Sequence, residues 1–402
     1  MISNIIMSNV SKILFLNQMA GPLFRELAED ISLKMPGNSI LLTGHKDTLM
    51  MNFSSSKLKI CEAPTYNRRS KLSRVFSWMS YSLTAFWQML KCDKSTIIFL
   101  VSNSPFLNFF VLFIRAVKKT RYVVLVYDIH PDTLINFGVL KENSFIVKMW
   151  SFINRMLWER SVAVYTIGAV MAQNLSKKFN VKKSKLGRVG IVSPWVDTSK
   201  IKPIDILQNP LIELTKGSKL TVLYSGNMGV SHDMDSILQA AKILKDEKNI
   251  MFLLIGAGAK WQDALEFQVK NNLTNLQVLP FQPESKLPYT MTLADIALVS
   301  LDDGAEGLML PSKIVYYMAA GAAIIGICKG ENDVSEIIQN SSCGITVEPK
   351  NPERLATTIK NLAIDAKKLN EFKESARKSA VANFSRNICT EKLNQEILSV
   401  IN

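Results

Sequence analysis

Apolar and polar positions alternate in blocks along the first half of the chain. Short apolar runs bounded by polar residues predict buried strands at 12–16, 39–42, 97–101, 122–126 and 162–166. Segments of helical period are found at 23–33, 72–90, 105–117, 144–161 and 168–179. Alternating strands and helices predict a mostly parallel sheet that is covered on both faces.

The alternation restarts after 191–203, a segment with two prolines and no period that is typical of a linker. Strands are predicted at 219–225, 251–255, 276–278, 296–299, 323–327 and 344–347. The helices between them are predicted at 234–244, 259–270, 287–293, 311–319 and 334–339. The chain therefore has the pattern of an α/β fold with two Rossmann-like doubly wound domains facing a central cleft.

The expected limits are 1–198 for the N-terminal domain and 199–384 for the C-terminal domain. A closing helix at about 385–402 can pack back on the first domain. The apolar stretch 96–114 is long enough to suggest a membrane span, but the polar residues and proline at 102–105 break it. We interpret it as a strand, a loop and a helix.

Charge is distributed unevenly. The whole chain has 48 Lys and Arg against 34 Asp and Glu, a net charge of +14. The excess lies in residues 1–200, whereas the remainder is slightly acidic. A bias confined to one half predicts that this half faces an anionic partner, either a membrane surface or nucleic acid.

Metal-binding patterns are weak in this sequence. The chain has three His and five scattered Cys with no CxxC pair, which argues against zinc and favours reduced thiols in a cytoplasm. The adjacent Asp302 and Asp303 are followed by Gly304 and are typical of a turn. We expect no metal and no other cofactor.

Two glycine turns follow predicted strands of the second half. Gly226, Asn227 and Gly229 come directly after the first strand, and Gly256 and Gly258 follow the second. Glycines at a strand end allow a close backbone approach and leave N–H groups free to bind phosphate. Ordinary strand–helix turns would look the same. The second turn is not a full GxGxxG, so it supports NAD binding only weakly.

A third motif runs from Glu306 and Gly307 to Pro311, Ser312 and Lys313. Pro311 suits the first turn of a helix, where free N–H groups and the helix dipole favour a phosphate. Lys313 adds a positive charge there. Glu306 precedes the helix on a loop, where its carboxylate can accept hydrogen bonds from sugar hydroxyls. A capped surface helix is the alternative.

From Leu220 to Val347, this order of motifs resembles the donor domain of GT-B glycosyltransferases, specifically the retaining family 4. The form PSK…MAAG, residues 311–321, resembles the branch that works on bacterial lipid-linked saccharides. In the first half the resemblance rests on 126–131 and 158–160, with 191–197 as the hinge strand.

The resemblance implies roles for matching positions. Gly226 and Asn227 would line the donor diphosphate and Lys313 would neutralise it. The other implied contacts are Gly256 and Gly258 to the nucleotide, Phe281 to the base, and Glu306 and Gly307 to the sugar. Two positions depart from the family pattern. Tyr316 replaces the second glutamate of the usual pair, and His232 stands where many members have a phosphate-binding lysine.

Asp128 and His130 follow a strand of the first half, at the edge expected to face the cleft. Either side chain could orient or deprotonate an acceptor hydroxyl. A structural role for a single histidine at this place is an equal alternative.

A basic cluster precedes an aromatic helix in the first half, a combination typical of a helix lying on a membrane surface. The residues concerned are Arg68, Arg69, Lys71, Arg74, Trp78 and Trp87. Trp150 and Trp158 are expected to extend the same face. A core helix is the alternative, and no nucleic-acid recognition motif is present.

The leading hypothesis is a hexosyl- or N-acetylhexosaminyltransferase, peripheral to the cytoplasmic face of the inner membrane. It would move a sugar from UDP to a polyprenyl-diphosphate-linked saccharide, with retention, in O-antigen or capsule synthesis. A UDP-sugar epimerase of the same fold and a non-enzymatic membrane-associated module are the rival hypotheses.

Overall fold

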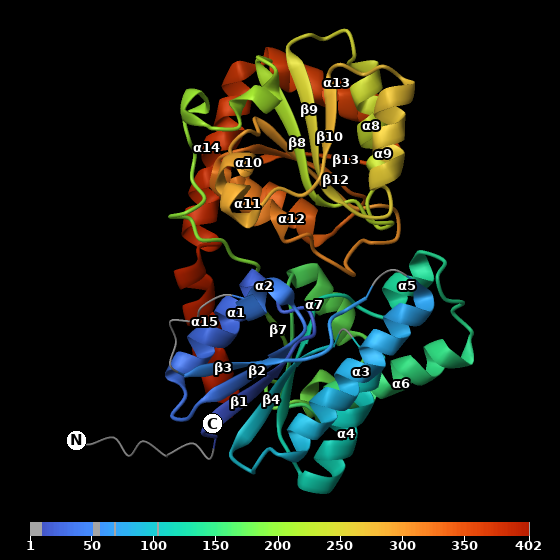
Figure 1. The fold of residues 1–402 in the computed structure, drawn as a ribbon, viewed down its shortest axis with the longest axis vertical. Coiled ribbons are helices and arrows are strands. Elements are labelled where there is room, and N and C mark those ends of the chain that lie inside the picture. The colour runs from blue at the N-terminus through green and yellow to red at the C-terminus, as the bar shows by residue number, and fades with distance from the viewer. Residues whose placement is uncertain (1–9, 51–56, 68–69, 103, 402) are drawn as a thin grey trace, which may run out of the picture. The chain divides into compact units, whose positions relative to one another are not determined.

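The computed structural model describes residues 10–50, 57–67, 70–102 and 104–401 (Figure 1). The chain divides into two compact units. Unit 1 contains the chain up to Ser193 together with the residues from Thr390 onward, and unit 2 contains Pro194–Cys389.

Unit 1 is built on a seven-stranded parallel sheet with the order β3-β2-β1-β4-β5-β6-β7. Its strands are β1 (Lys12–Leu16), β2 (Ser39–Thr43), β3 (Leu58–Glu62), β4 (Thr96–Val101), β5 (Tyr122–Val126), β6 (Ala163–Thr166) and β7 (Val189–Ile191). Its helices are α1 (Pro22–Lys34), α2 (Lys46–Met50), α3 (Lys71–Leu90), α4 (Pro105–Lys118), α5 (Asp132–Asn136), α6 (Phe145–Arg160) and α7 (Ala169–Ser176). The last helix, α15 (Arg386–Ile401), starts in unit 2 and ends in unit 1.

The central strands of unit 1 form its core. Every residue of β4 and β5 is buried, as expected for parallel strands covered on both faces. The rings of Phe15, Phe24 and Phe99 pack together with centroids 5.6–6.2 Å apart. The interpretation of 96–114 as a strand, a loop and a helix is confirmed by β4 and α4. Within the described residues, no helix combines the length and the apolar character that crossing a membrane requires.

Unit 2 is built on a six-stranded parallel sheet with the order β10-β9-β8-β11-β12-β13. Its strands are β8 (Leu220–Asn227), β9 (Ile250–Ala257), β10 (Leu276–Leu279), β11 (Ile296–Ser300), β12 (Ala323–Ile327) and β13 (Gly344–Val347). Its helices are α8 (Met234–Ile243), α9 (Trp261–Lys270), α10 (Leu287–Met291), α11 (Lys313–Ala320), α12 (Asp333–Ser341), α13 (Pro352–Ile364) and α14 (Ala366–Asn383).

The prediction of two Rossmann-like doubly wound α/β units is confirmed. In unit 2 the strand order reverses between β8 and β11, because the chain fills one side of β8 before it crosses to the other. In open parallel sheets, ligands bind outside the carboxyl ends of the strands at such a switch point. The loops after β8 and β11 are therefore the place to look for a site.

Candidate functional site

The backbone at the end of β8 lies very close to the backbone at the end of β9. No side chain fits at Gly256 or Gly258, which face it. A Cβ atom on Gly256 would lie 1.9 Å from the carbonyl oxygen of Gly226, and one on Gly258 would lie 2.5 Å from that of Met228. Gly226 and Gly258 also have positive φ angles, 143° and 139°. Gly256 and Gly258 are thus required for packing against the β8 loop, whatever they do for a ligand.

Lys313 is the first residue of α11, and its side chain reaches back over the end of β8. Its Nζ atom lies 3.5 Å from the centroid of the Tyr224 ring and 3.3 Å from the position that a Cβ atom on Gly226 would occupy. Nζ is buried and has no hydrogen-bond partner in the described part of the chain. Burial lowers the pKa of Lys313 to about 7. A desolvated ammonium held only by a ring face favours an anionic partner strongly.

His232 joins the two strands of the switch point. Its Nδ1 atom lies 2.6 Å from the carbonyl oxygen of Ser300, the last residue of β11. Burial, and to a smaller extent the charge of Lys313, lowers the pKa of His232 to about 4. The ring is therefore neutral at pH 7 and donates its Nδ1 proton to the carbonyl. His232 positions the β8 loop, and Lys313 rather than His232 brings positive charge to this place.

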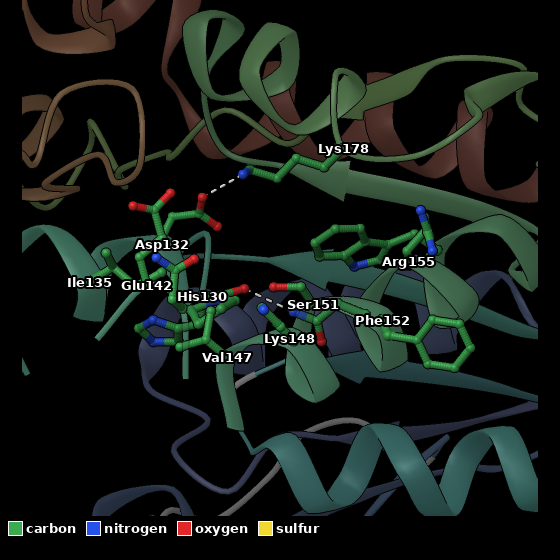
Figure 2. A pocket seen from close by; sticks show the side chains of 14 residues that line it. His130, Asp132, Ile135, Glu142, Val147, Lys148, Ser151, Phe152, Arg155 and Lys178 are labelled. Carbon is green, nitrogen blue, oxygen red and sulfur yellow. Dashed lines mark hydrogen bonds and ion pairs between the residues drawn. The ribbon is translucent and has the colours of Figure 1, made fainter. Parts of the chain in front are cut away.

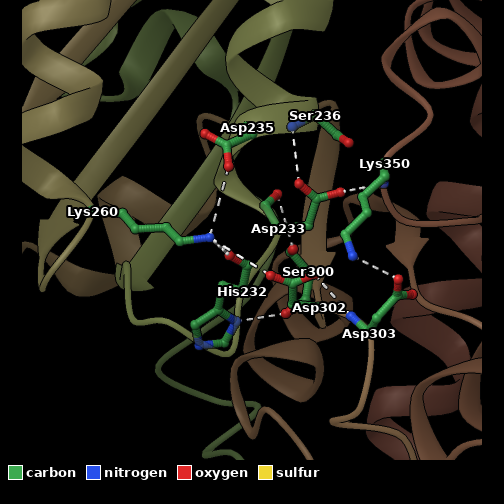
Figure 3. A network of polar contacts seen from close by, with 9 residues as sticks. All are labelled: His232, Asp233, Asp235, Ser236, Lys260, Ser300, Asp302, Asp303 and Lys350. Carbon is green, nitrogen blue, oxygen red and sulfur yellow. Dashed lines mark hydrogen bonds and ion pairs between the residues drawn. The ribbon is translucent and has the colours of Figure 1, made fainter. Parts of the chain in front are cut away.

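A polar network continues from His232 and fixes the surrounding loops (Figure 3). Lys260, next to α9, donates to the carbonyl oxygen of His232 at 2.9 Å and lies 3.7 Å from the carboxylate of Asp302. Asp233 accepts from the backbone N–H groups of Ser236 and Lys350. Sequence reasoning missed Lys260 because it follows the second glycine turn, where only the glycines formed a motif.

The loop into α11 contains the remaining predicted donor residues of this segment. Glu306 is half-buried, and its carboxylate accepts a hydrogen bond from the N–H of Gly304 at 2.7 Å. Gly307 has a φ of 62°, which favours glycine. Pro311 and Ser312 precede the helix, and the Ser312 side chain makes no capping bond. Phe281, which follows β10, is 55% exposed, so its side chain is accessible from solvent.

Tyr317 is a site-positioning residue that the sequence did not reveal. Its buried hydroxyl accepts from the N–H of Ser225 at 2.7 Å and donates to the carbonyl oxygen of the same residue at 3.1 Å. It thereby ties α11 to the end of β8. The only signal in the sequence was that this position is aromatic and follows Tyr316, which replaces the second glutamate of the family pattern.

We expect Tyr317→Phe to lower the free energy of unfolding by about 1–3 kcal/mol, because two backbone groups lose a buried partner. Urea denaturation of the full chain measures the change. Tyr289→Phe, at an exposed position of α10, is the matched control and should leave the transition unchanged. Equal transitions for the two variants would show that the Ser225 bonds contribute nothing.

In unit 1, Asp128 and His130 follow β5, as expected. Burial raises the pKa of Asp128 and lowers the pKa of His130. The carbonyl oxygen of His130 accepts from Asn154 of α6 at 2.8 Å. His130 lines a hollow of about 510 Å³ between the start of α5 and α6 (Figure 2). Lys178 closes one side through an ion pair of 2.5 Å with Asp132.

A second hollow of unit 1 was missed by sequence reasoning. It measures about 610 Å³ and follows the carboxyl ends of β1, β2 and β3. Its polar lining includes Gln18, His45, Lys46 and Asn67. His45 is held by Thr48, whose hydroxyl lies 3.2 Å from Nδ1. The position directly after two predicted strands was the available signal, because parallel strands end at a common edge.

The residues predicted to contact a membrane differ from one another in exposure. Arg68 and Arg69 lie outside the described residues, and Lys71 begins α3. Arg74 is half-buried, Trp78 is half-buried and stacks on Tyr66, and Trp87 is 64% exposed.

The prediction that Trp150 and Trp158 extend this face is wrong, because both side chains are buried against the core of unit 1. As for metals, the described residues contain no group of three His, Cys, Asp or Glu side chains that could hold an ion.

Residues 208–379 match the family described as "Glycosyl transferases group 1". The chain is 26% identical to the probable glycosyltransferase WbjE of Pseudomonas aeruginosa over 275 residues, 68% of this chain and 66% of WbjE. It is 28% identical to the putative colanic acid biosynthesis glycosyl transferase WcaI of Escherichia coli K12 over 158 residues, 39% of this chain and 38% of WcaI. The matched regions thus span less than two thirds of these relatives.

A solved structure is similar over nearly the whole chain. HepE of Anabaena, in complex with UDP-glucose, has a TM-score of 0.71 at 14% identity, over 96% of this chain and 99% of HepE. At this identity the likeness shows the fold, and the predicted GT-B fold is confirmed.

Proposed function

We propose that this chain, whose residues 208–379 belong to the group 1 glycosyl transferases, moves a sugar from a UDP-sugar to a lipid-linked saccharide, with retention, in the synthesis of a bacterial surface polysaccharide. The observation that carries the donor half of the proposal is the buried, unpartnered ammonium of Lys313 at the switch point of unit 2. The name of WbjE supports glycosyl transfer, the name of WcaI, which refers to colanic acid biosynthesis, supports the polysaccharide, and the HepE complex supports UDP.

A nucleoside diphosphate suits the chemistry of this place. Its phosphate oxygens would pair with Lys313 and with backbone N–H groups at the start of α11, where the helix dipole favours negative charge. A Cβ atom on Gly226 would lie 3.3 Å from Nζ of Lys313. Because glycine has no such atom, the space beside the ammonium stays open for a phosphate oxygen. Phe281 would stack on the base, and Glu306 would accept hydrogen bonds from the sugar hydroxyls.

Catalysis would rest on stabilising the departing diphosphate. As the bond from the sugar to the phosphate oxygen breaks, negative charge grows on the oxygen beside Lys313. A neighbouring cation in a desolvated place stabilises that charge more than it would in water. Correct placement of the acceptor hydroxyl supplies the rest of the acceleration.

The acceptor half of the proposal rests on unit 1. Its excess of basic residues suits a diphosphate-linked acceptor, and the hollows at His130 and His45 offer polar side chains after strand ends. Because burial lowers its pKa, His130 is neutral at pH 7 and able to take a proton from a hydroxyl.

Incubating bacterial membranes and the purified chain with a panel of radiolabelled nucleotide sugars tests the proposal. We expect label from one UDP-sugar to enter the lipid fraction, and Glu306→Ala or Lys313→Ala to abolish the transfer. Interconversion of the UDP-sugar without acceptor would instead identify an epimerase. If no sugar nucleotide is bound or consumed, the enzyme hypothesis fails.

A further inference from the structure

One side of unit 1 exposes an unusual amount of apolar surface. The helices concerned are α3, α4 and α6, with α4 packed between the other two (Figure 1). They make up about an eighth of the chain, yet half of the large apolar side chains that are exposed among the described residues belong to them. Soluble surfaces scatter such residues singly, so a concentration of this kind marks an interaction surface.

The exposed residues form stripes rather than isolated points. On α4, Phe109, Phe113 and Val117 are four residues apart and therefore share one face of the helix. On α6, Phe145, Met149 and Phe152 repeat the pattern at spacings of four and three.

On α3, Leu72, Phe76, Leu83 and Trp87 also share one face. The ring of Phe86 joins α3 to α4, with its centroid 5.1 Å from that of Phe110 and 6.0 Å from that of Phe113. The three stripes thus belong to neighbouring helices, and we call them together the aromatic face.

The charge of these helices is almost entirely positive. α3 and α4 contain basic residues and no carboxylate, and the one acid of α6 is Glu159. Glu159 is already bound by Lys183, with Nζ and Oε2 2.7 Å apart. The aromatic face therefore lies in a field that attracts anions.

A basic hollow of about 460 Å³ opens beside the aromatic stripe of α4. It is lined by Arg115, Lys119 and Arg160 with two apolar residues, and no carboxylate contributes to it. Arg115 is held in place, since it donates to the carbonyl oxygen of Thr120 at 3.2 Å and lies 5.8 Å from the Tyr122 ring centroid. A fixed guanidinium beside two further cations suits a phosphate.

We infer that the aromatic face is a docking surface for an anionic phospholipid bilayer, with lipid phosphates entering the hollow at Arg115, Lys119 and Arg160. The phenylalanines and Trp87 would enter the boundary between headgroups and acyl chains, as in other basic-aromatic interfacial helices. The bilayer is favoured over a second copy of the chain because two such faces would bring like charges together. The inference rests on unit 1 alone and stands whether or not the proposed transfer is correct.

Co-sedimentation of the full chain with vesicles tests this inference. We expect binding to vesicles that contain phosphatidylglycerol, weaker binding at high salt, and about tenfold less binding to pure phosphatidylcholine. A stripe variant, Trp87→Ser with Phe109→Ser and Phe113→Ser, should lose binding by about tenfold or more. A hollow variant, Arg115→Gln with Lys119→Gln and Arg160→Gln, should lose the preference for phosphatidylglycerol.

The matched control replaces three apolar residues of unit 2 that are even more exposed, Leu207→Ser with Val269→Ser and Ile364→Ser, and should bind like the unaltered chain. Circular dichroism and binding of UDP, which concerns unit 2, verify that each variant is folded. Equal vesicle binding by the stripe variant and the control would overturn the inference. So would a dimer in light scattering that the stripe variant abolishes, because the face would then belong to a second copy.

Discussion

Lys313→Met is expected to weaken UDP binding about 10- to 100-fold. Methionine keeps an apolar stem that can lie over Tyr224 and removes only the charge that would face the diphosphate. A hydrogen bond to a charged group contributes about 1.5–3 kcal/mol, and the phosphate left without a partner adds to the loss. Isothermal titration of the full chain with UDP measures the effect.

The control for this experiment is Lys360→Met, which removes an exposed lysine of α13 that pairs with Glu247. It should bind UDP normally. Thermal unfolding should show that Lys313→Met is as stable as the unaltered chain or more so, because an unpaired buried ammonium costs free energy. Undiminished UDP affinity in a stable Lys313→Met variant would remove the central observation behind the proposed donor.

The sequence predicted the central strands of both sheets well because burial on both faces gives unbroken apolar runs, as in 97–101 and 122–126. It missed β3 and β7. β3 includes Lys59 and Glu62 and is only partly buried, and β7 has three residues. A short or half-exposed edge strand leaves too little periodic signal to be separated from a loop.

The tryptophans of α6 show a second limit. This helix is apolar on both sides, with Val147, Trp150 and Leu157 buried and Phe145 and Phe152 exposed. Helical period identifies the residues that share a face, but it cannot say which of two apolar faces enters the core. The assignment of Trp150 and Trp158 to the surface failed for this reason.

For the candidate site, sequence reasoning selected Lys313 and the glycine turns from local motifs. It could not supply contacts between residues far apart in the chain. Tyr224 and Lys313 are 89 positions apart, yet the ammonium lies on the ring, and His232 meets Ser300 across the switch point. These contacts follow from the order in which the strands are placed in the sheet. They show that His232 also positions the β8 loop, a role that its place in the motif did not indicate.

The affinity for UDP should fall as the pH rises above 7. Burial lowers the pKa of Lys313 to about 7 in the unliganded protein, so the ammonium is lost above that pH. UDP binds the protonated form, and its terminal phosphate, with a pKa of about 6, is already ionised in this range. We therefore expect the affinity to fall about tenfold for each pH unit between 7 and 9.

The free energy of unfolding should change with pH in the opposite direction. Opposite trends in affinity and stability would identify the ionisation of Lys313 as their common cause. Between about pH 7 and the unfolded-state pKa of about 10.4, the unfolded chain holds a proton on Lys313 that the folded chain does not. The Lys313 contribution to the free energy of unfolding therefore increases with pH across this window, while UDP affinity decreases. Titrations with UDP and thermal unfolding at matched pH values measure both trends. Lys313→Met should remove the pH dependence of affinity above pH 7, and an unaltered chain with constant affinity from pH 7 to 9 would show that Lys313 does not need to be charged to hold the diphosphate.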